Sequence, residues 1–83
     1  MKKSQITRIE EHLTDLLRRS DRLEDKAWEY RLGDNSVKAH KCERLSWGLA
    51  SEIDGICYVL ETLGYIAVSD TDNKFTITKR SSD

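Results

Sequence analysis

The sequence predicts a mainly α-helical protein, in which an antiparallel two-helix hairpin of coiled-coil type is followed by a short C-terminal β-hairpin. Three observations support this fold class. Apolar residues recur every three or four positions in two long stretches, a short turn-forming segment separates the stretches, and the segment after residue 64 is rich in β-branched and aromatic residues. The chain also contains no proline, so long helices can run without interruption.

The first stretch, residues 4–32, has the apolar spacing of a coiled-coil seam. Its seam positions alternate by threes and fours when Ser20 fills one gap. They are Ile6, Ile9, Leu13, Leu16, Ser20, Leu23, Ala27 and Tyr30. Gly33 follows directly and is a typical residue at the end of a helix. We expect one continuous helix over residues 4–32, with Ser20 as a small residue tolerated in the seam.

The second stretch, residues 37–63, predicts a second helix that ends at Gly64. The segment Gly33-Asp34-Asn35-Ser36 before it is rich in turn and capping residues. Because the connection is so short, the two helices must be antiparallel neighbours. The main apolar stripe of the second helix consists of Cys42, Leu45, Leu49, Ile53, Ile56, Leu60 and Leu63.

The C-terminal segment, residues 65–79, predicts a β-hairpin. Two short runs of β-branched and aromatic residues flank the turn-forming residues 69–73. A lone two-stranded hairpin is barely stable in water, so we expect it to pack on the helices or on another subunit. Residues 80–83 form the predicted tail, and the whole chain, residues 1–83, is expected to be a single domain.

The composition predicts a core that is completed by association. The chain has 83 residues, of which 37% are hydrophobic and 35% charged, so each helix has apolar residues for about one stripe. A domain this small buries a modest fraction of its unfolded surface. A homodimer would supply the missing contacts, and we expect its core to be a four-helix bundle.

A second conspicuous surface lies in the stretch WGLASEIDGICYVLETLGY, residues 47–65. Two glycines within this helix each cost about 1 kcal/mol relative to alanine, and they permit another backbone to approach closely. Large amphipathic aromatic residues border them. We therefore predict a partner-binding surface made of Trp47, Gly48, Ser51, Asp54, Gly55 and Tyr58. The C-terminal hairpin, a second copy of the chain or a foreign protein could cover it.

The distribution of charge favours a protein partner over nucleic acid. The net charge is −1, whereas general nucleic-acid binders usually carry a basic excess. From residue 45 to residue 73 there are acidic residues but no lysine or arginine, which suits recognition of a basic protein surface. The candidate nucleic-acid contacts are Lys38, Lys41, Arg44, Lys74, Lys79 and Arg80.

The passage Leu60-Glu61-Thr62-Leu63-Gly64-Tyr65 into a hairpin resembles the recognition helix and wing of winged-helix DNA-binding domains. The resemblance covers about residues 53–79, and it implies a nucleic-acid-binding regulator as the alternative function. Two features depart from that pattern. A long helical hairpin precedes the passage, and the exposed helix face carries Asp54 and Glu61, which phosphates would repel.

Chemistry-bearing residues do not form a catalytic or metal-binding pattern. His40 and Cys42 are two positions apart, which points them to different sides of a helix, and the segment from Asp70 lacks the central glycine of a calcium loop. The two cysteines, Cys42 and Cys57, are about 22 Å apart along a helix and cannot pair within it. We expect no enzyme activity, no cofactor and no metal. Without a signal or membrane-spanning pattern, we expect a cytoplasmic protein.

The run Gly-Ile-Cys-Tyr-Val-Leu-Glu-Thr-Leu-Gly-Tyr, on a helix that leads into a short hairpin, resembles small helical proteins encoded by phages and prophages. The likeness covers about residues 44–66 and carries over no functional residue. It implies a non-enzymatic accessory or inhibitory protein. The leading hypothesis is a homodimeric protein-binding module that regulates or inhibits a nucleic-acid-handling machine, for example in the manner of an anti-CRISPR protein.

Overall fold

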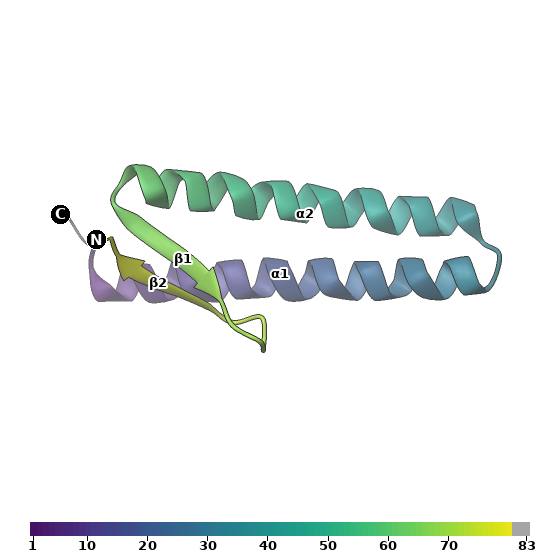
Figure 1. Ribbon diagram of the computed structural model, residues 1–83, viewed down its shortest axis with the longest axis horizontal. Helices are drawn as coiled ribbons and strands as arrows, with labels where there is room; N and C mark the ends of the chain where they lie inside the picture. Colours follow the sequence, from purple (N-terminus) through teal and green to yellow (C-terminus); the bar gives the residue numbers. More distant parts are fainter. Residues whose placement is uncertain (81–83) are drawn as a thin grey trace.

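The chain folds into two long antiparallel helices with a β-hairpin packed across one end of the helix pair (Figure 1). The computed structural model describes residues 1–80, so the predicted tail lies outside the described residues except for Arg80. In chain order the elements are α1 (Lys3–Leu32), α2 (Ser36–Thr62), β1 (Tyr65–Ser69) and β2 (Phe75–Lys79). The molecule is elongated, with dimensions of 52 × 21 × 21 Å. The predicted order of two helices and an antiparallel hairpin is confirmed.

The seam of α1 follows the predicted alternation. All eight seam positions are buried or half-buried, and Leu13 and Leu16 are almost completely excluded from solvent. Ser20 is also buried, and its hydroxyl oxygen lies 2.7 Å from that of Ser46 on α2. Each hydroxyl additionally approaches the other residue's main-chain carbonyl oxygen, at 3.4 and 3.3 Å. The two hydroxyls therefore satisfy each other where the helices cross the middle of the seam.

The predicted stripe of α2 is wrong at two positions. Leu45 and Leu63 are 53% and 59% exposed, whereas Ser46 is buried. The observed inner face keeps a strict three–four alternation and consists of Ala39, Cys42, Ser46, Leu49, Ile53, Ile56 and Leu60. Ser46 occupies the seam in place of Leu45 because its small side chain matches Ser20 across the helix pair. Leu45 is thereby turned toward one side of the seam.

The helix ends are set by local hydrogen bonds and by two residues in the left-handed region. The Asn35 side chain accepts a hydrogen bond from the Lys38 N–H at 3.3 Å and caps the start of α2. Asp34, in the turn before it, has φ 58°, a conformation that aspartate adopts more readily than most residues. Gly64 has φ 88° after the end of α2, so this glycine lets the chain turn sharply into β1.

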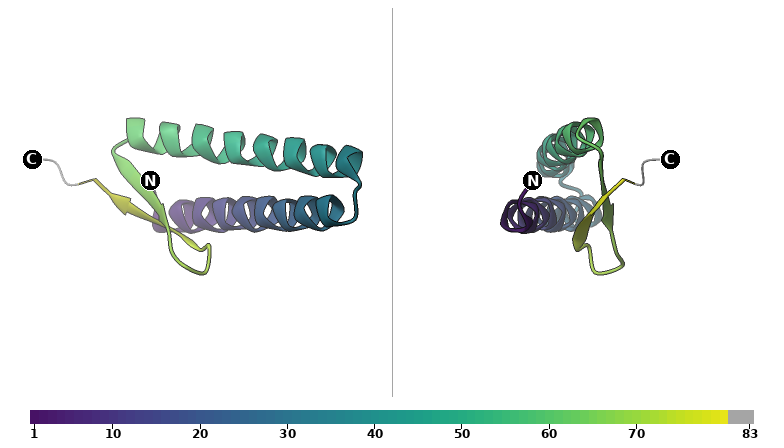
Figure 2. Two further views of the ribbon diagram at one scale, coloured as in Figure 1. Left: turned by 45° about the vertical axis from the view of Figure 1, so that its right-hand side comes forward. Right: turned by 90° about the vertical axis from the view of Figure 1, so that its left-hand side faces the viewer.

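The β-hairpin packs its inner face on the core formed by the two helices. Its strands pair antiparallel, with Ala67 opposite Ile77. Phe75 and Ile77 are buried with Leu13, Leu16, Ile53 and Leu60 in one hydrophobic cluster. The hairpin lies on one side of the helix pair only (Figure 2). It thus forms a third layer over the end at which α1 begins and α2 ends.

Two side chains of α1 attach β2 to the helix. The Phe75 N–H donates to the Thr14 hydroxyl at 3.0 Å, and the Ile77 N–H donates to the Glu10 carboxylate at 2.7 Å. In the hairpin loop, the Asp70 carboxylate accepts the N–H groups of Asp72 and Lys74. The Asn73 side chain donates to the carboxylate of Asp21 on α1. These bonds fix the position of the strands along α1.

Replacing Thr14 by valine tests the attachment of β2. Valine keeps the size and branching of threonine but removes the acceptor for the buried Phe75 N–H, so the free energy of unfolding should fall by about 1–3 kcal/mol. Thr14→Ser is the matched control, because serine retains the hydroxyl and should lose less. Urea unfolding followed by circular dichroism measures both. Equal stability of the valine variant and the wild type would show that the bond contributes nothing.

Candidate protein-binding surface

The six residues predicted to bind a partner share the outward face of α2. Trp47 and Tyr58 are 63% and 73% exposed, and the four residues between them are exposed as well. No atom lies within 4 Å of a Cβ built on Gly48 or Gly55. We call this set, Trp47, Gly48, Ser51, Asp54, Gly55 and Tyr58, the outer strip. The hairpin, one of the three occupants considered, does not cover it.

Next to the glycine edge of the outer strip, an apolar groove runs between the helices on the side away from the hairpin. Its floor is made by half-buried residues of both helices, namely Ile9, Leu23, Leu49 and Ile56. Its rim is made by exposed residues of α2, namely Leu45, Val59 and Leu63. The groove holds two open depressions of about 490 and 480 Å³, one beside Gly48 and the other beside Gly55, and no hairpin residue lines either.

A weak ion pair crosses the middle of the groove. His12 Nε2 on α1 lies 3.9 Å from the Glu52 carboxylate on α2, and both side chains are about half exposed. An exposed pair at this distance contributes little to stability. Its position is informative, however, because the apolar surface continues on both sides of it, toward Leu45 in one direction and toward Leu63 in the other.

Cationic residues gather at the end of the groove nearest the turn between the helices. Arg19, Arg22 and Arg44 line the depression that contains Leu45, and Lys41 lines a neighbouring one with Arg44. Lys79 and Arg80, in contrast, lie at the end of β2, at the far end of the molecule (Figure 1). The structure therefore does not bring the six predicted nucleic-acid contacts together in one surface.

Acidic residues are associated with the hairpin side of the helix pair. Cys57 packs against the cluster that contains Phe75 and Ile77, and its pKa is raised by burial, by the nearby Asp54 carboxylate and by that of Glu61. Asp54 and Glu61 are three positions before and four positions after Cys57, so they share its face of α2.

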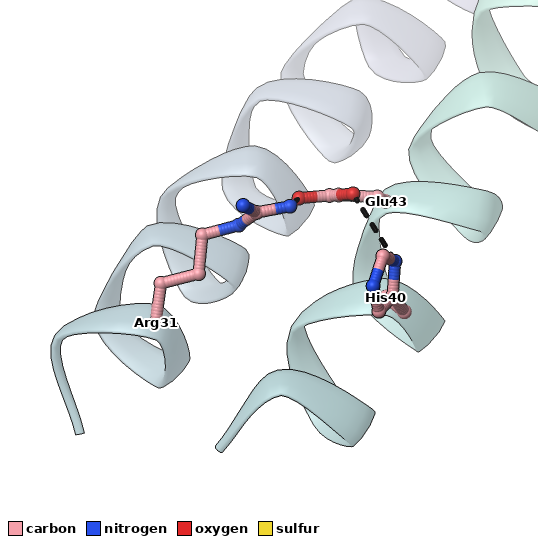
Figure 3. Close-up of polar contacts among 3 residues, drawn as sticks. All are labelled: Arg31, His40 and Glu43. Atoms are coloured by element: carbon pink, nitrogen blue, oxygen red, sulfur yellow. Dashed lines mark hydrogen bonds and ion pairs between the residues drawn. The ribbon is translucent and has the colours of Figure 1, made fainter. Parts of the chain in front are cut away.

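Near the turn between the helices, Glu43 of α2 pairs with Arg31 of α1 and lies 3.7 Å from the His40 ring (Figure 3). This carboxylate is largely covered, whereas the Arg31 side chain is half exposed. The pair links the two helices at the end that the hairpin does not reach. The ion pair with Arg31 also offsets the charge of Glu43.

The groove rim was not predicted from the sequence, because Leu45 and Leu63 were predicted to lie in the helix seam and Val59 was not assigned to a face. The signal was present in the spacing: residues 45, 48, 52, 55, 59 and 63 recur by threes and fours and define a second helical stripe, in which glycine occupies two positions. Thr14 and Glu10, which hold β2, carry no local signal because their partners are more than sixty residues away.

Two classes of site are not found within residues 1–80. No group of three or more histidine, cysteine, aspartate and glutamate side chains converges there in a way that could hold a metal ion. In the same part of the chain, neither helix has the length and apolar character needed to cross a bilayer.

The reactivity of the Cys57 thiol tests whether the Asp54 carboxylate lies beside it. Asp54→Asn removes a neighbouring negative charge, which should lower the pKa of Cys57 and raise its rate of alkylation by iodoacetamide at about pH 8. Cys42, about 22 Å away along α2, is the internal control and should react at an unchanged rate. Mass spectrometry of tryptic peptides over time measures both rates. An unchanged rate at Cys57 would contradict the placement of Asp54 beside it.

Comparisons with known proteins give the chain no relative. No protein-family model matches it, and no curated protein or solved structure is significantly similar to it.

Proposed function

We propose that this chain is a non-enzymatic protein-binding module that works as a homodimer, with the apolar grooves of two copies packed together into a four-helix bundle. The observation that carries the proposal is the groove itself. Its floor is continuous with the hydrophobic core, its rim exposes Leu45, Val59 and Leu63, and the two glycines beside it have open space above them. An exposed apolar surface of this kind is typical of an interface.

The size of the face is sufficient for a stable dimer. The molecule measures 52 Å along the helices and 21 Å across, which gives a face of roughly 1,000 Å². A standard interface buries about 800 Å² on each partner. Burial of apolar surface contributes about 25 cal/mol per Å², before the costs of association are subtracted. The dimer would therefore supply the contacts that each short helix pair lacks.

The charges favour an antiparallel arrangement of the two copies. The cations Arg19, Arg22 and Arg44 lie at one end of the groove, and the other end is lined by Met1, Val59 and Leu63. A parallel arrangement would bring like charges together, which is unfavourable. A twofold axis near His12 and Glu52 instead sets the cations of one copy over the apolar end of the other. The long stems of the arginines can pack on that apolar surface.

The acidic residues Asp54 and Glu61 of α2 favour a basic protein as the foreign partner. Asp54 and Tyr58 of the outer strip lie on α2 together with Glu61, and the aromatic residues offer large contact areas with polar tips. Such a surface can compete with nucleic acid for a basic groove on a protein that handles nucleic acid. We propose that the chain acts in this way as a phage-type regulator or inhibitor. The alternative is a nucleic-acid-binding regulator, favoured by the cluster of Arg19, Arg22 and Arg44. Tight, salt-sensitive binding to duplex DNA would support it instead.

Val59→Lys tests the dimer. A lysine on the rim of the groove should shift the dimer toward monomer, because the antiparallel arrangement sets Arg19, Arg22 and Arg44 of the second copy over this end of the groove and like charges repel. Val68→Lys is the matched control, since Val68 is 58% exposed, close to the 55% of Val59, but lies on the hairpin. Sedimentation equilibrium at micromolar concentration measures both variants. A wild-type protein that is monomeric and well folded in this range would refute the dimer.

The variant Gly55→Ala separates helix stability from association. A Cβ at this position meets no atom of the same chain, so alanine should raise the free energy of unfolding of the monomer by about 1 kcal/mol. If the glycine provides clearance for a second copy, the same variant should weaken the dimer. Ser51→Ala is the control, as it adds no atom. A variant that is more stable and equally dimeric would exclude Gly55 from the interface.

A further inference from the structure

The outer edge of β1 in the β-hairpin is free along the whole strand. The strands pair with Ile66 opposite Thr78 and Val68 opposite Thr76, and the main-chain bonds on either side of the ladder are Arg80 N–H to Gly64 O and Asp70 N–H to Lys74 O. These bonds show that the main-chain N–H and C=O groups of Ile66 and Val68 point toward β2 and take part in the ladder. The N–H and C=O groups of Tyr65, Ala67 and Ser69 therefore point away from β2. Within residues 1–80, these main-chain groups have no hydrogen-bond partner.

The outward main-chain N–H groups of the two edges differ in their hydrogen bonding. On β2, the outward N–H groups of Phe75 and Ile77 are both bound by side chains of α1. Strands at an edge are usually protected by charge, proline, a bulge or a covering element. β1 has none of these: the segment Leu63–Ser69 contains no charged residue and no proline, and its outer face exposes Ile66 and Val68. An uncharged free edge of this kind can accept another strand.

The helix pair provides a floor for an added strand. The hairpin covers only the end of the pair at which α1 begins, and beyond β1 both helices continue uncovered to the turn between them (Figure 1). A strand placed beside β1 would therefore have helix surface beneath it. A second copy that paired antiparallel through its own β1 would have its helices on the same face of the sheet, in the space that the uncovered helices already occupy. An extended segment without a helical layer of its own meets no such obstacle.

The charges near the edge define the chemistry of that segment. Asp54 and Glu61 flank Cys57, which packs against the cluster beneath the hairpin, close to the end at which β1 begins. At the other end of β1 the loop exposes Asp72 and Lys74, and its Asn73 side chain donates to the carboxylate of Asp21 on α1. Lys79 lies opposite Tyr65 on β2, on the side of β1 away from the free edge. An added strand would thus have acidic side chains near both of its ends. Cationic residues at its ends complement them, and β-branched residues between them favour the extended conformation.

We propose that the free edge of β1 binds an extended segment of a partner protein, which carries cationic residues at its ends and adds as a third strand over the uncovered part of the helix pair. This inference deepens the proposed function, since it names the kind of partner that the module takes. It uses the hairpin side of the molecule and leaves the groove on the opposite side to the dimer.

A peptide titration of the ¹⁵N-labelled full chain tests the proposal by NMR. The probe is a seven-residue peptide of alternating valine and threonine with lysine at each end. The amide signals of Tyr65, Ala67 and Ser69 should shift and exchange more slowly with solvent, because their N–H groups gain acceptors. The same peptide with glutamate at both ends should bind at least about tenfold more weakly. A probe with N-methyl groups on the edge facing β1 should not bind.

The variant Ser69→Pro removes one donor from the free edge. The Ser69 N–H points away from β2, so proline deletes no bond of the ladder and is tolerated at a strand edge. This variant should lose affinity for the lysine peptide by about tenfold or more. Ser69→Thr, which keeps the N–H, is the matched control. The wild-type shift pattern of residues distant from β1 confirms that each variant is folded.

Two results would overturn the proposal. One is the absence of any change at the three edge amides up to about 1 mM peptide, and the other is equal affinity of the proline and threonine variants. Val59→Lys, on the opposite side, should respond to the peptide as the wild type does. Because the oligomeric state and the peptide response are measured separately, a failure of the dimer and a failure of the strand site are distinguishable.

Discussion

The structure depends on a single seam between α1 and α2. With 37% hydrophobic residues in 83 positions, each helix has one apolar stripe to bury, and that stripe packs against the other helix. At the middle of the seam, Ser20 and Ser46 meet instead of two large residues. Their small size lets the helices approach, and their mutual hydrogen bond removes the cost of burying two hydroxyls. The register set here decides which residues are left outside.

The position of the hairpin follows from that register. Gly64 turns the chain back immediately after α2, so β1 must start at the end of the helix pair where α1 begins. Phe75 and Ile77 then reach the core between Leu13 and Leu60, and Thr14 and Glu10 bind the outward N–H groups of β2. One side of the helix pair gains a third layer at one end. The other side keeps its groove, and β1 keeps a free edge.

Local patterns were enough to predict the fold, because both helices and both strands carry signals within a few residues. The seam of α1 was predicted residue by residue, including Ser20. In α2 the same reasoning chose Leu45 over Ser46, since hydrophobicity alone ranks leucine higher. The correct choice depends on Ser20, twenty-six positions away, which a pattern within one helix does not contain.

The candidate site was predicted in part, for a related reason. The exposed aromatic residues and the glycines of the outer strip could be identified on α2 alone. The groove needs both helices, because Ile9 and Leu23 of α1 complete a floor that begins with Leu49 and Ile56 of α2. The free edge of β1 needs the strand register and the bonds from Thr14 and Glu10. Each of these surfaces is a property of elements in contact, and local composition does not encode the contact.

Although the net charge is only −1, the molecule has one cationic surface and one acidic surface. Arg19, Arg22 and Arg44 line one end of the groove, whereas Asp54 and Glu61 share the face of α2 that carries Cys57, which packs against the core cluster. Because the charges nearly cancel over the whole molecule, long-range attraction to a charged partner is weak, and selection must occur at short range. There, a surface of one sign rejects partners of the same sign as effectively as it attracts the opposite one. A chain with only one hydrophobic seam can in this way keep its two proposed binding surfaces distinct, since their charges differ.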